Sequence, residues 1–190
     1  MIKRAFSIMV SFILIASMAM SMTGCKKVSE EEAINLVKSL VSRSYNLNVV
    51  YYGEGLKYKE SGNPNQIYLP VQENEIYVLR SVLIKDTYEV FSETLASSIV
   101  DMAFGGAEGG TSASSVQSRY MVEGDDDWLL VNKDYKSVKK EITKYNYDTI
   151  EITKISRRFI EANIKSTKGE NVEVVLIKQG ESWRLDSITC

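Results

Sequence analysis

The sequence predicts an α+β fold, with helices packed on one face of a curved antiparallel sheet. Residues 29–44 and 76–104 carry apolar side chains at intervals of three and four, which is the spacing of amphipathic helices. From residue 149 onward, apolar and polar residues alternate in short runs separated by polar turns, which is typical of antiparallel strands. Helices that come first and a meander that comes last are the order expected of an α+β domain.

The first 24 residues have the layout of a secretory signal. Lys3 and Arg4 form a positive segment, and no charged residue occurs from Ala5 to Met20. A charged start followed by a short apolar segment is typical of a cleaved signal peptide. An uncleaved membrane anchor is the alternative, because a spanning helix needs about 20 apolar residues and this run is nearly that long.

The tetrapeptide Met22-Thr23-Gly24-Cys25 decides between the two. It resembles the lipobox of bacterial lipoproteins, in which small residues precede a cysteine that is diacylated and becomes the first residue. Met22 departs from the leucine that is usual at its position. The resemblance implies cleavage before Cys25, lipid on Cys25 and a short tether over residues 25–28. Because two acyl chains anchor a protein stably, we expect it on the outer face of the bacterial cell membrane, extracytoplasmic and lipid-anchored.

The first two helices are predicted from capping and periodicity. Ser29 and Glu32 have the spacing of a capping box, and the apolar positions that follow recur until about Ser44. The second helix is predicted over residues 76–90. The β-branched and aromatic residues 76–78 would also fit a strand.

A third helix is predicted to begin after Ser92 and to stop at Gly105. Residues 105–118 then form a low-complexity stretch rich in Gly, Ser and Ala, with a single charge. Such a stretch buries too little surface to order itself, so we expect a flexible loop within one domain, or a linker.

Short strands flank two loops in the middle of the chain. Residues 67–71 predict a strand, and Pro70 within it favours an edge position. Residues 119–123 and 128–132 predict two strands around the turn 124–127. The three aspartates of that turn suggest calcium, but their spacing lacks the alternate acids and later glutamate of an EF-hand. We interpret them as a solvated hairpin turn.

The last part of the chain predicts an antiparallel meander. The run 172–178 is apolar on both faces, which favours a central strand. Residues 133–145 are basic and receive no assignment. The four predicted strands are residues 149–155, 158–165, 172–178 and 183–188.

Composition excludes several kinds of catalysis. The chain has no histidine, which excludes Ser-His-Asp and Cys-His catalysis and histidine-ligated metals. Composition does not exclude catalysis by two carboxylates, as in glycosidases. However, no spacing among the 25 acidic residues identifies such a catalytic pair. We predict no catalytic residue, no cofactor and no metal. Without Lys3 and Arg4 the chain has 21 basic residues against 25 acidic ones, which does not indicate nucleic-acid binding.

The 166 residues left after cleavage have the length of one domain, which we place at residues 29–190. If Cys25 carries lipid, Cys190 has no partner within the chain, so no disulfide supports the fold. We interpret Cys190 as an idle thiol, and an intermolecular disulfide is the alternative.

The segment Val174-Val175-Leu176-Ile177-Lys178-Gln179-Gly180-Glu181-Ser182-Trp183-Arg184-Leu185-Asp186-Ser187 resembles the last hairpin of NTF2-like and cystatin-like secreted domains. Those domains commonly end with a strand, a polar turn, and then Trp, a basic residue and an apolar residue. The resemblance implies a curved sheet wrapped on helices.

Within that group the chain is similar to the IseA family of inhibitors of cell-wall DL-endopeptidases. The similar features, in order, are the N-terminal helix, Tyr68-Leu69-Pro70-Val71, Tyr88-Glu89-Val90-Phe91-Ser92-Glu93-Thr94-Leu95-Ala96 and Trp183-Arg184-Leu185-Asp186-Ser187. The chain departs from the family at Asp125-Asp126-Asp127-Trp128, where members often have a glycine-bearing hairpin, and at the insertion 105–118. No inhibitory residue transfers from the family.

Three functions are compatible with these observations. The first is a non-enzymatic binding module that inhibits or regulates a peptidoglycan hydrolase, or binds another envelope protein. The second is a small-ligand-binding, or carboxylate-based enzymatic, NTF2-like domain whose pocket is lined by some of the 11 tyrosines. The third is a structural envelope protein. We predict the first, because no catalytic motif is present and the IseA resemblance implies an inhibitor.

Overall fold

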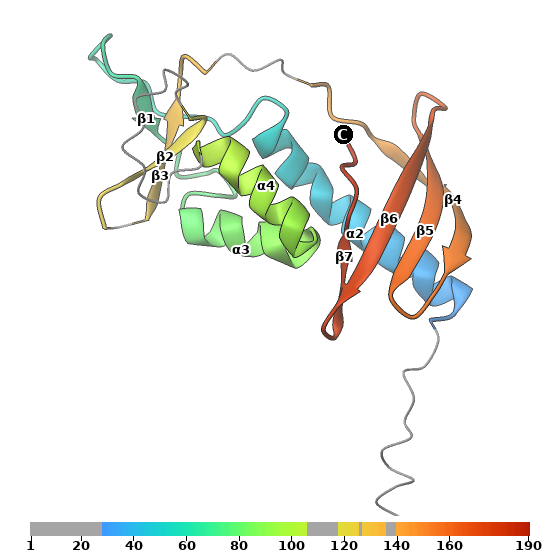
Figure 1. Cartoon of the computed structure of the whole chain (residues 1–190). Coiled ribbons are helices and arrows are strands. Elements are labelled where there is room, and N and C mark those ends of the chain that lie inside the picture. Colours follow the sequence, from blue (N-terminus) through green and yellow to red (C-terminus); the bar gives the residue numbers. More distant parts are fainter. Residues whose placement is uncertain (1–27, 106–117, 126, 136–139) are drawn as a thin grey trace, which may run out of the picture.

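The computed structural model describes residues 28–105, 118–125, 127–135 and 140–190 (Figure 1). The described residues form three helices and two antiparallel sheets, which confirms the predicted α+β class. The elements in chain order are α2 (Glu30–Tyr51), β1 (Tyr68–Pro70), α3 (Arg80–Val90), α4 (Glu93–Phe104), β2 (Tyr120–Glu123), β3 (Trp128–Asn132), β4 (Tyr145–Ile155), β5 (Phe159–Ser166), β6 (Asn171–Gln179) and β7 (Ser182–Leu185). The predicted signal peptide, the lipid-bearing Cys25 and residues 106–117 of the predicted loop lie outside the described residues.

The larger sheet is the predicted C-terminal meander. Its strand order is β4-β5-β6-β7, and every neighbouring pair is antiparallel. The prediction that residues 172–178 form a central strand is confirmed, because β6 lies between β5 and β7. Strand β4 begins at Tyr145, four residues earlier than predicted. Helix α2 lies against this sheet, mainly on β4 and β7 (Figure 1).

The smaller sheet has the strand order β1-β3-β2. It confirms the hairpin around residues 124–127 and places β1, which contains Pro70, at an edge. These strands do not extend the meander but form a sheet of their own. Helices α3 and α4 lie between the two sheets in Figure 1.

One cluster of buried apolar residues connects the three helices with the two sheets. It includes residues of α2, α3 and α4 and of both sheets. The buried tyrosines Tyr51, Tyr77 and Tyr120 belong to it. Tyrosine therefore fills this core, and each buried hydroxyl has a hydrogen-bond partner.

Helix α2 is longer than predicted: it ends at Tyr51 and not near Ser44. Its start was predicted correctly, since the Ser29 hydroxyl accepts a hydrogen bond from the Glu32 amide. The last two turns contain Asn and β-branched residues that favour helix poorly. They remain helical because Leu47 and Val50 are buried in the core. In addition, Arg119 and the first residue of β2, Tyr120, donate hydrogen bonds to the end of the helix.

The donors come from two consecutive residues. The Arg119 guanidinium donates to the carbonyl oxygens of Tyr51 at 3.0 Å and Gly53 at 2.7 Å. The Tyr120 hydroxyl donates to the Val50 carbonyl at 2.8 Å. The last turn of α2 contains no basic residue of its own. Arg119 therefore provides the positive charge that a helix C-terminus favours, and it does so while buried.

The second helix starts later than predicted. Helix α3 begins at Arg80, and residues 76–79 are not helical. Its N-cap position is Leu79, whose side chain cannot accept a hydrogen bond. The acceptors come from the β2–β3 hairpin: the Asp127 carbonyl accepts from the Arg80 amide at 2.9 Å, and an Asp127 carboxylate oxygen accepts from the Ser81 amide at 2.7 Å. The strand-like residues 76–78 are thus left outside the helix.

Both predicted ends of the third helix are confirmed. The Ser92 hydroxyl accepts from the Leu95 amide, and Gly105 ends α4 in the left-handed conformation with φ of 73°. Ser92 also connects α4 to the larger sheet, because its amide donates to the Leu185 carbonyl and its hydroxyl donates to Asp186.

We predict that Arg119→Met lowers the free energy of unfolding by about 3 kcal/mol, because hydrogen bonds to a buried charged donor contribute about 1.5–3 kcal/mol and two carbonyl groups lose theirs. Urea unfolding followed by circular dichroism measures this. Arg157→Met, at an exposed arginine, is the matched control and should change stability little. Equal effects of the two substitutions would contradict the role given to Arg119.

We predict that Asp127→Gly lowers the free energy of unfolding by about 1 kcal/mol, the usual loss on removal of an N-cap acceptor. Glycine is chosen because Asp127 has φ of 61°, so the substitution adds no backbone strain. Asp127→Asn is the control, because asparagine also tolerates a positive φ and keeps a side-chain oxygen that can accept from the Ser81 amide. The capping role fails if both variants unfold at the same urea concentration.

Candidate functional site

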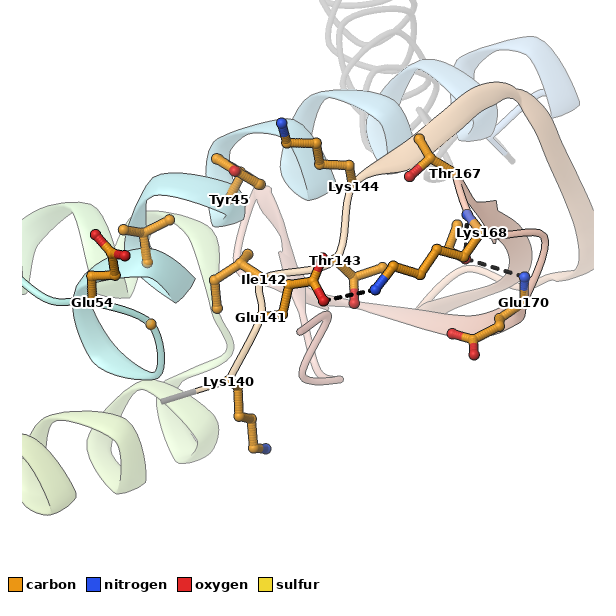
Figure 2. A pocket seen from close by; sticks show the side chains of 13 residues that line it. Tyr45, Glu54, Lys140, Glu141, Ile142, Thr143, Lys144, Thr167, Lys168 and Glu170 are labelled. Carbon is orange, nitrogen blue, oxygen red and sulfur yellow. Dashed lines mark hydrogen bonds and ion pairs between the residues drawn. The ribbon is translucent and has the colours of Figure 1, made fainter. Parts of the chain in front are cut away.

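A cavity of about 660 Å³ lies between the C-terminal half of α2, residues 140–144 and the turn that joins β5 to β6 (Figure 2). Three segments that are distant in sequence thus form one depression. Its lining residues are Tyr45, Val49, Gly53, Glu54, Lys140, Glu141, Ile142, Thr143, Lys144, Ser166, Thr167, Lys168 and Glu170.

Residues 140–144 approach α2 closely because of Gly53. A Cβ atom at this position would lie 2.9 Å from the Val49 carbonyl oxygen and 3.1 Å from Cγ1 of Ile142. Both distances are shorter than ordinary van der Waals contact. The Lys140 amide donates to the Tyr52 carbonyl at 3.0 Å and fixes the segment beside the end of α2.

The cavity carries three lysines and three glutamates. One pair is joined: Lys168 Nζ lies 2.7 Å from a Glu141 carboxylate oxygen, which connects two walls of the cavity (Figure 2). This hydrogen bond and the positive charge of Lys168 lower the pKa of Glu141 below its usual value. Glu141 is therefore held as a carboxylate and does not have the raised pKa of a general acid.

Two tyrosines lie beside the cavity without lining it. Lys140 Nζ is 5.4 Å from the centre of the Tyr52 ring. Burial raises the pKa of Tyr52 to about 12, and burial likewise raises the pKa of Tyr145 to about 12. The nearby Cys190 thiol adds to both shifts, and burial raises its own pKa. Cys190 is a free, half-buried thiol.

A second surface is formed by the side of the smaller sheet that faces away from the core. Residues directly opposite each other in a sheet share a face. The pairs Pro70↔Leu130, Met121↔Leu130 and Leu79↔Trp128 therefore place five apolar side chains together. We call these residues the outer face: Pro70, Leu79, Met121, Trp128 and Leu130.

The outer face is partly exposed, and acids surround it. Trp128 is 48% exposed and Met121 is 42% exposed, and Ile76, three residues before Leu79, is 66% exposed. Glu123 lies directly opposite Trp128 in the hairpin. The acidic rim of this face consists of Glu123 and of Asp125 and Asp127 in the hairpin turn.

The site residue predicted from sequence, Cys25, lies outside the described residues, as does Asp126 of the acidic turn. Within the part of the chain that the structure describes, no group of three Asp, Glu or Cys residues is arranged to hold a metal ion. Sequence reasoning missed the cavity, because residues 140–144 had no assignment. Their basic composition was the one signal available.

No protein-family model matches the chain, and no curated protein matches it. The resemblances to lipoproteins, to NTF2-like and cystatin-like domains and to the IseA family therefore stay predictions. Among the described residues, no helix has both the length and the apolar character needed to cross a membrane.

We predict a loss of stability at alkaline pH that depends on Tyr145. Its pKa is raised from 10.0 to about 12, so the folded state retains a proton that the unfolded state releases. The stability that this provides is complete below pH 10 and is lost as the pH rises toward 12. The free energy of unfolding, measured with urea at several pH values in this range, should fall less steeply with pH for Tyr145→Phe than for the unchanged protein. Parallel curves would contradict the assignment.

Proposed function

We propose that this protein is a lipid-anchored, extracytoplasmic, non-enzymatic binding module that inhibits or regulates a cell-wall hydrolase. The outer face is the observation that carries the proposal. A half-exposed tryptophan on an apolar sheet surface has the composition of a protein-binding hot spot, since tryptophan is enriched where truncation costs the most binding energy. Clustered exposed apolar residues with a polar rim are typical of interaction surfaces.

The charges around the outer face favour a basic partner. Its acidic rim, Glu123, Asp125 and Asp127, would attract a positively charged protein and orient it on approach. A basic enzyme is attracted to an anionic cell wall, so we expect wall hydrolases to be basic. Such an enzyme would fit this surface. A lipid tether on Cys25 would keep the module at high local concentration near such an enzyme.

The test measures inhibition directly. The protein would be extracted from its host in detergent and added to a purified DL-endopeptidase that is cleaving peptidoglycan. We expect inhibition that weakens as salt rises, because rim charges are screened by ions. Trp128→Ala should raise the inhibitor concentration needed by about tenfold or more.

Ile188→Ala is the matched control, because Ile188 is 44% exposed and is not part of the outer face. It should inhibit like the unchanged protein. If neither the unchanged protein nor the Ile188→Ala variant inhibits any peptidoglycan hydrolase of the host, the proposed inhibition is wrong. If Trp128→Ala inhibits normally, the surface assignment is wrong.

A further inference from the structure

We propose that strand β2 binds an extended, basic segment of the partner protein by antiparallel strand addition, so that the segment becomes the next strand of the smaller sheet. The proposal rests on the proposed function, because it names the part of the basic partner that lies beside the outer face. Addition of a strand to an exposed sheet edge is a general mode of peptide recognition. It requires an edge with unpaired backbone groups and side chains that match the incoming strand.

The backbone groups of β2 point alternately toward β3 and away from it. The Asn132 amide donates to the Arg119 carbonyl, so these opposite residues form a hydrogen-bonded pair. In antiparallel strands such pairs alternate with pairs whose backbone groups point away from each other. In the register of β2 and β3, Tyr120 and Val122 belong to the second kind. Within the part of the chain that the structure describes, no further strand pairs with β2 on that side.

The edge of the smaller sheet at β1 is already covered. The Lys59 amide donates to the Pro70 carbonyl at 2.8 Å, and the Gln72 amide donates to the Lys57 carbonyl at 3.0 Å. Pro70 has no amide hydrogen to offer, which is a common protection of sheet edges. Strand β1 is therefore not available to a partner.

The two edges of the larger sheet are protected as well. At β7, the Leu185 carbonyl accepts from the Ser92 amide at 2.7 Å, and the Trp183 carbonyl accepts from the Arg184 guanidinium at 3.0 Å. At β4, the register is irregular in two places. Charged residues are also exposed along β4: Asp148, Glu151 and Lys154. Irregular register and exposed charges both disfavour pairing with another strand. Strand β2 has a regular register and a charge only at its last residue, Glu123.

The outer side of β2 favours a segment that is both apolar and basic. Met121 lies on the outer face and is 42% exposed. Glu123 follows it on the same side, and Asp125 is exposed in the hairpin turn beyond. Because directly opposite residues of neighbouring strands are in contact, an added strand would place an apolar residue beside Met121 and a basic residue beside Glu123. Strand β2 contains no basic residue, so a second copy of this chain would leave these acids without a partner.

The inner side of β2 sets the opposite requirement. The Tyr120 ring lies 6.0 Å from the Phe104 ring, and the Arg80 guanidinium lies 5.4 Å from the centre of that second ring. A positive charge is thus already present on the inner side, where a basic residue of the partner would be repelled. The incoming segment should carry its basic residues on alternate positions only, with uncharged residues between them.

The probe is the blocked peptide acetyl-Lys-Thr-Val-Thr-Val-Thr-Lys-amide, whose lysines and valines share one face and whose threonines form the other. With valine opposite Met121 and lysine opposite Glu123, its first two threonines lie opposite Val122 and Tyr120. The amides of these threonines then hydrogen-bond to β2, and those of the two valines point away from it. The peptide is added to the full-length protein in detergent, and binding is followed by isothermal titration calorimetry up to about 10 mM, a range suited to millimolar affinity.

Two N-methylated peptides test the pairing on the unchanged protein. N-methylation of the first two threonines removes both amide donors to β2 and should weaken binding by about tenfold or more. N-methylation of the two valines is the matched control, because it changes the same number of amides on the far edge. It should leave binding nearly unchanged.

A substitution in β2 tests the same bonds from the other side. Val122→Pro removes an amide that points to the open edge and keeps the hydrogen bonds to β3, since proline is tolerated at such edge positions. It should also weaken binding of the unmodified peptide by about tenfold. Val122→Ala retains the amide and should bind like the unchanged protein. Circular dichroism checks that both variants are folded, and the N-methylated peptides decide the question if Val122→Pro is not.

The proposal is overturned if the unmodified peptide does not saturate, if the two N-methylated peptides bind equally or in the reverse order, or if folded Val122→Pro binds like Val122→Ala. It is also overturned if sedimentation shows a dimer that Val122→Pro abolishes, because β2 would then bind a second copy. The titration contains no enzyme. Inhibition without peptide binding therefore contradicts strand addition alone, and peptide binding without inhibition contradicts only the proposed function.

Discussion

The contact of Arg119 and Tyr120 with the end of α2 determines how the rest of the molecule is arranged. Helix α2 packs on the larger sheet, while these two residues begin the hairpin of the smaller sheet. Their hydrogen bonds to Val50, Tyr51 and Gly53 therefore join the two sheets through one helix end. A buried guanidinium is costly unless its donors are satisfied. That cost favours the single arrangement in which the helix carbonyls and Arg119 meet.

The same constraint positions both candidate surfaces. Because α2 continues to Tyr51, Gly53 and Glu54 lie where residues 140–144 can pack against them, and the cavity forms at this junction. Because the inner side of the smaller sheet, including Tyr120, is used against the core, Trp128 and Met121 of its outer face are left toward solvent, while Leu130 of the same face is buried. The two surfaces differ in chemistry: one is apolar with an acidic rim, and the other is polar with balanced charge.

Helix ends show why local sequence was sufficient in some places and insufficient in others. Ser29, Ser92 and Gly105 cap their own helices, so their effect can be predicted from neighbouring residues. The start of α3 and the end of α2 depend on Asp127 and Arg119, which are 46 and 68 residues away from the groups they bind. No local pattern contains that information, and both ends were predicted wrongly.

The sequence by itself determined the α+β class, the meander, the central hairpin and the position of the edge strand, because alternation, turn residues and caps act over a few neighbouring residues. Only the tertiary structure decided that the strands divide into two sheets, that Arg119 extends α2, and that Tyr45, Lys144 and Thr167 line one cavity. These features depend on which buried surfaces and unpaired backbone groups meet across the folded chain. Which surfaces and backbone groups meet depends on the burial of the whole core, so no short segment of the sequence determines it.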